Sequence, residues 1–170
     1  MGILETIAVA FSMFSAIPMP RVQWSERNMR YALCAFPLIG GVIGLACWLW
    51  AWLGSLLRLP GLLMGAGWCL IPLLLTGGIH MDGFCDTCDA LASHADPSRK
   101  REILKDPHLG AFGAIRLGMY LIASLALWAC LPVYRPVPVL LGFCLSRSLS
   151  GLAVTRFPLA GGTGLARTFA

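Results

Sequence analysis

Long uncharged stretches separate short polar segments along this chain. Residues Tyr31–Leu57, Leu59–Ile79 and Leu117–Tyr134 contain no charged side chain. A membrane-spanning helix requires about 20 mostly apolar residues, so these three runs predict three spans. Pro136–Thr155 predicts a fourth span, in which Arg147 must be accommodated.

The first segment, Ile3–Met19, is apolar but contains Glu5 and ends in a stretch with two prolines, Pro18 and Pro20. Proline lacks the amide donor and stops a helix. We therefore expect an interfacial or re-entrant helix. A cleavable signal would need a basic leading region, and none precedes this run, which favours a retained segment. The pattern predicts an all-α polytopic integral membrane protein of about four spans plus this first helix, in a single membrane-embedded domain over residues 1–170.

Composition supports a bilayer location. The chain of 170 residues is 58% hydrophobic and only 12% charged, with a mean hydropathy of +0.76. Soluble domains carry about 25% charged residues. The sequence therefore predicts a multi-pass protein of the cell (inner) membrane.

Basic residues predict the orientation, because cytoplasmic loops are enriched in Lys and Arg. Eight basic residues fall on one side of the predicted spans: Arg21, Arg27, Arg30, Arg99, Lys100, Arg101, Lys105 and Arg116. The opposite side would carry Arg58 and Arg135. The polar segment after the second span is thus expected in the cytoplasm. We attribute the net charge of +5 to topology and lipid head groups, and expect no nucleic-acid partner.

One polar window, residues 80–116, holds most of the chemistry of the chain. It contains six of the eight carboxylates, all three histidines and both lysines. If Asp82–Ala90 is helical, Asp82, Asp86 and Asp89 stand at i, i+4 and i+7 on one stripe. Three acids so close repel one another unless a cation offsets them. Hard oxygen ligands favour Mg²⁺ or Mn²⁺, and Mg²⁺ is commonly shared with substrate phosphates.

Neighbouring residues fit the same interpretation. Gly83 and the pair Gly77-Gly78 would let a bulky substrate approach the backbone closely. His80 would bind phosphate or orient an acid. The alternative is that the acids belong to an ordinary solvated loop, and His80 alone would favour that alternative.

A second group of candidates follows in the same window. Lys105 is a candidate for pairing with phosphate, Glu102 or Asp106 for completing a metal site, and Gly110 with Gly113 for bringing backbone amides to a ligand. Taken alone, these residues fit equally well as a surface ion pair, a turn acid and loop glycines. Asp96 before Pro97 predicts a helix cap.

Arg147 and a pair of cysteines lie apart from these two groups of candidates. A charge about midway through a predicted span is costly unless it faces protein, water or an anion, so Arg147 is a candidate substrate ligand; the alternative is that it snorkels to the membrane surface. Cys85 and Cys88 form a C-x-x-C, but no second pair completes a zinc site, and a disulfide is not expected in a reducing compartment.

At residues 76–113 the sequence closely resembles the cobalamin synthase family, also called adenosylcobinamide-GDP ribazoletransferases. One family pattern falls on Gly77, Gly78, His80, Asp82, Gly83, Asp86 and Asp89, and a second falls on Glu102, Ile103, Lys105, Asp106 and Gly110. The likeness extends to Phe11–Pro20, to Phe36–Gly40 and to Ser146-Arg147.

This resemblance implies a Mg²⁺-dependent membrane enzyme that joins adenosylcobinamide-GDP to α-ribazole, or its 5′-phosphate, with release of GMP. In this family the reaction belongs to the last stage of cobalamin biosynthesis. Asp82, Asp86 and Asp89 would bind the metal, and these three with His80 would be catalytic, Asp89 being one candidate base. The residues assigned to substrate are Gly83, Glu102, Lys105, Asp106, Gly110 and Arg147, and His80 would also support a substrate phosphate. Membrane lipids are expected partners, and a homo-oligomer is left open.

Family members usually run to roughly 250 residues, an ordinary length for one domain, so the chain is expected to lack their C-terminal third. Three alternatives remain open at this point. A phosphotransferase of the CDP-alcohol type also uses membrane aspartates and magnesium, but Thr87 and Cys88 stand where its arginine is expected. A divalent-cation transporter would want acids within a span. An inactive fragment is the third alternative.

Overall fold

The computed structural model describes residues 2–22, 24–25, 29–131 and 136–158, and its regular elements there are all helices. In chain order they are α1 (Ile3–Phe14), η1 (Ala32–Ala35), α3 (Phe36–Leu56), α4 (Gly61–Thr76), α5 (Ile79–Ala92), α6 (Pro97–Ile103), α7 (Ala111–Cys130) and α8 (Pro136–Arg156). The predicted all-α fold is confirmed.

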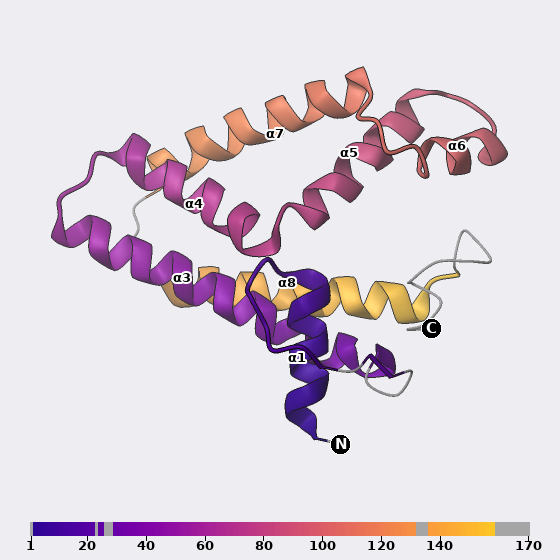
Figure 1. Cartoon of the computed structure of the whole chain (residues 1–170). Coiled ribbons are helices and arrows are strands. Elements are labelled where there is room, and N and C mark those ends of the chain that lie inside the picture. Colours follow the sequence, from indigo (N-terminus) through magenta and orange to yellow (C-terminus); the bar gives the residue numbers. More distant parts are fainter. Residues whose placement is uncertain (1, 23, 26–28, 132–135, 159–170) are drawn as a thin grey trace.

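Two helix pairs form the body of the molecule (Figure 1). Helix α8 packs along α3, and α7 packs along α4, while a sharp turn joins α3 to α4. Helix α1 and the short η1 pack at the beginning of α3. Helix α5 leads away from the end of α4 toward α6, and α7 returns beside α5. The polar window of the sequence therefore lies at one end of the molecule.

Glycines allow the paired helices to approach closely. A Cβ atom on Gly44 would lie 2.7 Å from the Cα of Leu140 in α8. A Cβ on Gly65 of α4 would lie 2.7 Å from the backbone nitrogen of Ala129 in α7. Small residues at such crossings let backbones come into van der Waals contact, which is the main attraction between helices in lipid.

The hydrophobic core lies where α1, α3 and α4 meet. Its buried residues are Phe11, Phe36, Ile39, Ile43, Cys47, Ala51, Met64 and Trp68. The indole of Trp50 donates a hydrogen bond of 3.1 Å to the Met64 carbonyl, which joins α3 to α4. The rings of Trp68 and Trp128 stack at 4.9 Å and join α4 to α7.

Among the described residues, three helices are long and apolar enough to cross a membrane: Ala32–Leu56, Ala111–Cys130 and Val137–Arg156. The number becomes four if the bent pair of α4 and α5 counts as one span. The apolar windows of α7 and α8 are each only 6% buried inside the protein. Such wide apolar surfaces suit a lipid environment.

The second predicted span, Leu59–Ile79, needs correction. Helix α4 ends at Thr76, and the axis turns by 95° before α5. Gly77 and Gly78 make this turn with φ angles of 62° and 77°. Residues with a side chain adopt this left-handed conformation only with strain, so the glycine pair explains why the helix breaks there.

Two other predicted boundaries also differ from the structure. Helix α1 ends at Phe14 instead of near Met19. The chain then turns toward α4, and the amide of Ala16 donates a 2.8 Å hydrogen bond to the carbonyl of Leu75. Helix α7 begins at Ala111 rather than Leu117 and ends at Cys130, while residues 132–135 of the predicted third span lie outside the described residues.

Candidate functional site

The three aspartates of the sequence stripe lie on one helix, as predicted. Helix α5 contains Asp82, Asp86 and Asp89 at helical spacing. Asp82 is exposed, and Asp86 and Asp89 are half-buried. Like charges at this spacing oppose helix formation, so the face needs an opposite charge or hydrogen-bond donors to offset the repulsion.

Asp89 obtains such donors from α7. Its carboxylate accepts one hydrogen bond of 2.9 Å from the Gly110 amide and another of 2.9 Å from the Gly113 amide. Gly110 is the N-cap of α7, where backbone amides are otherwise unpaired and the helix dipole favours negative charge. The contact therefore fastens α5 to the beginning of α7.

The glycines at positions 110 and 113 are required for this contact. A Cβ at Gly110 would lie 2.6 Å from the Cγ of Asp89, and a Cβ at Gly113 would clash with its Oδ2. The sequence predicts that the Gly110 and Gly113 amides approach a ligand, whereas in the structure both donate to the Asp89 carboxylate. The role of Asp89 as a metal ligand or base stays a prediction.

The fit of the site to Mg²⁺ rests on Asp82 and Asp86. Within the described part of the chain, no three His, Cys, Asp or Glu side chains converge closely enough to hold a metal ion. Magnesium is usually bound by one or two carboxylates together with waters and substrate phosphates. Two accessible carboxylates one helical turn apart satisfy that requirement, so the donor set fits the metal.

A pocket of about 530 Å³ lies beside Asp82. Its lining residues are Gly77, Gly78, Ile79, Met81, Asp82, Cys85, Leu109 and Leu117. The volume is in the range of small-molecule sites, which combine an apolar wall with a few polar groups. Asp82 is the charged group on this wall, and the glycine turn between α4 and α5 forms part of its edge.

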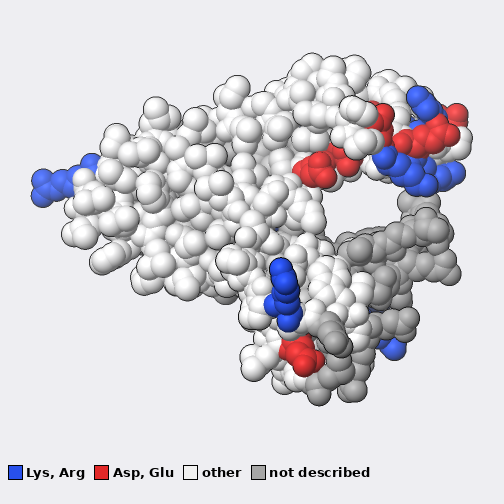
Figure 2. Space-filling view, viewed as in Figure 1, with Lys and Arg blue, Asp and Glu red and all other residues white. Residues whose placement is uncertain are grey.

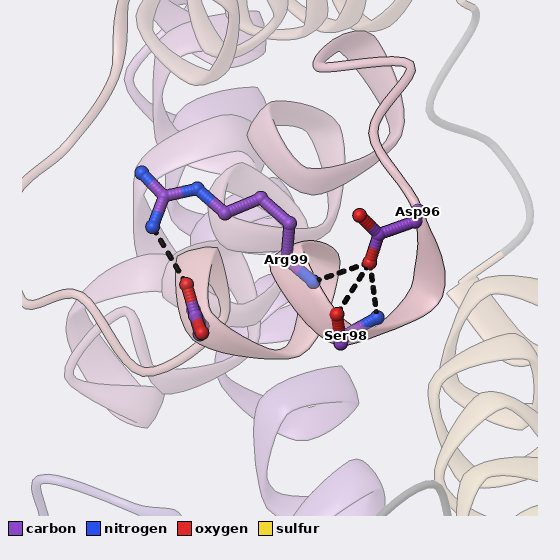
Figure 3. A network of polar contacts seen from close by, with 4 residues as sticks. Asp96, Ser98 and Arg99 are labelled. Atoms are coloured by element: carbon purple, nitrogen blue, oxygen red, sulfur yellow. Dashed lines mark hydrogen bonds and ion pairs between the residues drawn. The ribbon is translucent and has the colours of Figure 1, made fainter.

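The cap predicted at Asp96 is confirmed. Figure 3 shows its carboxylate at the beginning of α6, where it accepts hydrogen bonds from the Ser98 amide at 2.8 Å and the Arg99 amide at 3.0 Å. The Ser98 hydroxyl also donates to it, and these bonds lower the pKa of the Asp96 carboxyl. Arg99 in turn forms a 2.7 Å ion pair with Glu102.

The remaining candidates of the polar window are also engaged locally. Glu102 lies in that surface ion pair, and Asp106 accepts hydrogen bonds from the amide and the ring of His108, at 3.0 and 2.7 Å. The amide bond, followed by the ring bond, lowers the pKa of the Asp106 carboxyl. Both arrangements match the alternative of a surface pair and a turn acid. Lys105 is exposed.

Charge is concentrated at this end of the molecule. In Figure 2 acidic side chains gather at the polar end of the molecule, and basic side chains lie next to them. The rest of the visible face is mostly uncharged. An acidic surface beside a basic one can hold a metal ion and the phosphates that share it.

His80 and Arg147 both contact the ring of Phe36, which was not among the candidate site residues of the sequence. The His80 imidazole stacks on the Phe36 ring, with 5.7 Å between ring centroids. The Arg147 guanidinium carbon lies over the same ring at 5.7 Å from its centroid. In the sequence, Phe36 begins one of the stretches that carry the family resemblance, Phe36–Gly40, but no signal marked its ring as a contact for an imidazole and a guanidinium.

The Asp89 contact could have been anticipated in part. A G-x-x-G immediately before an apolar run is a position where an acid can cap a helix. The acid that does so, Asp89, lies 21 residues before Gly110, however. The two residues meet only because α6 and its flanking turns bring the chain back to α5.

Comparison with known proteins settles the family. Residues 6–170 match the family described as cobalamin-5-phosphate synthase. The chain belongs to this family. The resemblance that the sequence motifs suggested is thereby confirmed.

Similar proteins carry a consistent name. The chain is 46% identical over 166 residues to the adenosylcobinamide-GDP ribazoletransferase of Lachnoclostridium phytofermentans, covering 98% of this chain and 64% of that protein. It is 33% identical over 167 residues to the protein of that name from Clostridium perfringens strain SM101, covering 97% and 66%. It is 36% identical over 171 residues to that of Desulfitobacterium hafniense, covering 98% and 67%.

The chain thus spans about two thirds of the length of these curated relatives. No solved structure matches it.

Proposed function

We propose that this protein is an adenosylcobinamide-GDP ribazoletransferase, which joins adenosylcobinamide-GDP to α-ribazole or its 5′-phosphate. The membership of the cobalamin-5-phosphate synthase family supports this activity. The observation that carries the proposal is the acidic face of α5, on which Asp82 borders a pocket of about 530 Å³.

The reaction is a phosphoryl transfer. A ribose hydroxyl of the ribazole attacks the phosphorus that carries the cobinamide, a new P–O bond forms, the phosphoanhydride bond breaks, and GMP leaves with the bridging oxygen. Such transfers depend chiefly on positioning and on neutralising charge. Asp82 and Asp86 are accessible carboxylates that can accept the hydroxyl proton. Asp89 holds the beginning of α7 against this face.

We propose Mg²⁺ as the metal cofactor, held by Asp82 and Asp86. When bound, the metal would offset the negative charge of the phosphates and of the leaving GMP. Removal of the metal with EDTA is expected to abolish turnover, and Mg²⁺ is expected to restore it. Turnover that persists in EDTA would contradict this assignment.

Substrate binding is assigned to residues around the same end. Gly83 has open space around its Cα, since an added Cβ would meet no atom within 4 Å. A large side chain there is expected to obstruct the approach of the corrinoid without unfolding α5. Lys105, which is exposed, is assigned to a phosphate group. We place the acidic face at the cytoplasmic side of the cell (inner) membrane, following the distribution of basic residues.

The test is product release by the protein reconstituted in lipid nanodiscs. With adenosylcobinamide-GDP and α-ribazole, the protein is expected to release GMP. Asp82→Asn and Asp86→Asn are each expected to lower kcat by at least about 100-fold, the magnitude typical of a lost charge-stabilising group. Thr87→Ala, on the same helix, serves as the control and should retain activity.

Two rivals predict different results. A CDP-alcohol phosphotransferase would release CMP from a CDP-alcohol and no GMP from the corrinoid substrate. A divalent-cation transporter would move Mg²⁺ into proteoliposomes and release neither nucleotide. Either pattern would overturn the proposed activity.

A further inference from the structure

Phe36 lies at a junction of four helices. It opens α3, and its side chain is only 4% exposed. The ring of Phe14 from α1 packs on it with 4.8 Å between centroids. Through the contacts described above, the same ring also touches His80 of α5 and Arg147 of α8.

The Arg147 charge is incompletely compensated there. Arg147 belongs to the candidate span Val137–Arg156, where a guanidinium is costly unless it meets an anion or water. The Phe36 ring offers a cation–π contact, which attracts the charge but supplies no hydrogen-bond acceptor to the guanidinium N–H groups. The Arg147 Nε atom is buried and has no hydrogen-bond partner among the described residues.

His80 shows the same deficiency. Its Nδ1 atom is buried and likewise finds no hydrogen-bond partner in the described part of the chain. Buried polar atoms in native proteins are nearly always paired, so two unpaired nitrogens beside one ring require an explanation. A ligand that accepts hydrogen bonds and carries negative charge would satisfy both.

We infer that Phe36 is a positioning residue: its ring holds the His80 imidazole and the Arg147 guanidinium so that both bind one phosphate group of the nucleotide-linked substrate. The inference rests on the proposed function, which supplies that substrate. It adds an aromatic residue to the site and joins His80 and Arg147, which are 67 positions apart in the sequence (147 minus 80), into one recognition unit.

A merely structural role for Phe36 predicts something different. If the ring only filled the core, any side chain of the same shape would serve. A positioning role through the ring face depends on the electron density of the ring, because the cation is attracted by the ring quadrupole. Fluorine atoms on the ring withdraw that density with little change of shape.

The experiment replaces Phe36 with monofluoro-, difluoro- and trifluorophenylalanine in the full chain in nanodiscs. Equilibrium binding of adenosylcobinamide-GDP is measured for each. The expected result is a stepwise loss of affinity, reaching about fivefold to tenfold with three fluorines. Phe36→Leu should weaken binding at least as much.

Phe11 provides a matched control. It belongs to the same core cluster and is 8% exposed, and no cation contacts its ring in the described residues. Fluorination at Phe11 should leave affinity unchanged. Unfolding followed by tryptophan fluorescence should show the same midpoint for the fluorinated proteins and the unmodified one.

Equal affinity across the Phe36 series would overturn the inference and leave the proposed function standing. Failure of the unmodified protein to bind the probe would instead count against the proposed function. A lipid head group carries the same phosphate chemistry, so binding is repeated in nanodiscs that contain phosphatidic acid. Unchanged affinity is expected, whereas competition by this lipid would reassign the phosphate to the membrane.

Discussion

Asp89 joins α5 to α7. Its hydrogen-bond partner Gly110, at the beginning of α7, lies 21 residues later in the sequence. Hydrogen bonds to a charged group contribute about 1.5–3 kcal/mol each, more than those between neutral groups. This carboxylate also stands at the positive end of the α7 dipole. Its contribution to stability is therefore separate from any contribution to chemistry.

We predict that Asp89→Ala lowers the free energy of unfolding by about 2–4 kcal/mol, because two amides at the beginning of α7 lose a charged acceptor. Asp89→Asn keeps one oxygen acceptor and should lose about half as much. Unfolding in SDS titrations of the micellar protein measures both. Asp86→Ala is the control: it removes a like charge from the same face and should leave stability unchanged or higher. Equal losses for Asp89→Ala and Asp86→Ala would contradict the assignment.

Asp96 provides a prediction about pH. Its pKa is lowered from 3.8, first by the Ser98 hydroxyl and then by the Arg99 and Ser98 amides, so the folded helix prefers the charged carboxylate. A lowered pKa means that the stabilisation is present above pH 3.8 and disappears as pH falls through the lower folded value. Exchange of the Ser98 and Arg99 amides should accelerate, relative to other amides of α6, over that acidic range. In Asp96→Ala the same amides should already be unprotected at pH 7, and protection there would disprove the cap.

At the scale of the helices, close glycine contacts determine which helices pair. Gly44 lies against Leu140 in α8, and Gly65 lies against Ala129 in α7. In lipid the hydrophobic effect gives little preference for one helix partner over another. The fit of the two helix surfaces therefore determines which helices pair.

We predict that Gly44→Ala destabilises the protein by about 1–3 kcal/mol, the usual cost of overpacking. The clash is with backbone, the Cα of Leu140 at 2.7 Å, so a side-chain rotation cannot relieve it. Gly142→Ala on α8 meets no atom within 4 Å and is the matched control. Because alanine is the better helix former, this control should gain a few tenths of a kcal/mol. SDS unfolding curves distinguish the two, and a neutral Gly44→Ala would argue against the α3–α8 contact.

The sequence predicted the helices better than their junctions. Long apolar runs located α3, α7 and α8, because bilayer thickness sets the length of a spanning helix. Continuous hydropathy hid the break at Gly77-Gly78, since glycine counts as apolar whether it continues a helix or turns it. The end of α1 at Phe14 was also not predictable. The prolines show only that the helix must stop by Pro18, whereas it ends earlier because the Ala16 amide donates to the Leu75 carbonyl of α4.

The candidate site was predictable to a similar degree. Helical spacing placed Asp82, Asp86 and Asp89 on one face without any tertiary information. The different environments of these acids were not predictable, because the Asp89 partners come from another helix. Phe36 could not be found, since an aromatic residue in an apolar run carries no mark of the imidazole and guanidinium that pack on it.

At the scale of the whole molecule, charge separates the two ends. The turn between α3 and α4 contains Arg58, whereas the opposite end contains the acids and bases of α5 and α6 (Figure 2). With apolar helices between them, this separation predicts that the two ends lie on opposite sides of the membrane.

We predict that Ser55→Cys and Ser93→Cys, each in a background without other cysteines, react with a membrane-impermeant maleimide from opposite sides of the membrane. Both serines are exposed. In intact cells the cysteine at position 55 should be labelled from outside, and the cysteine at position 93 only after the cells are opened. Gly2→Cys, in the exposed beginning of the chain, reports the side of α1 in the same assay. Labelling of positions 55 and 93 from the same side would refute the topology.

The bent connection between α4 and α5 has a mechanical consequence. At one end α5 is joined to α4 through two glycines in the left-handed conformation, and at the other the Asp89 carboxylate fastens it to the beginning of α7. A tilt of the acidic helix would pivot on the glycines and would have to break both amide bonds of Asp89. These two bonds therefore couple the orientation of α5 to the first turn of α7.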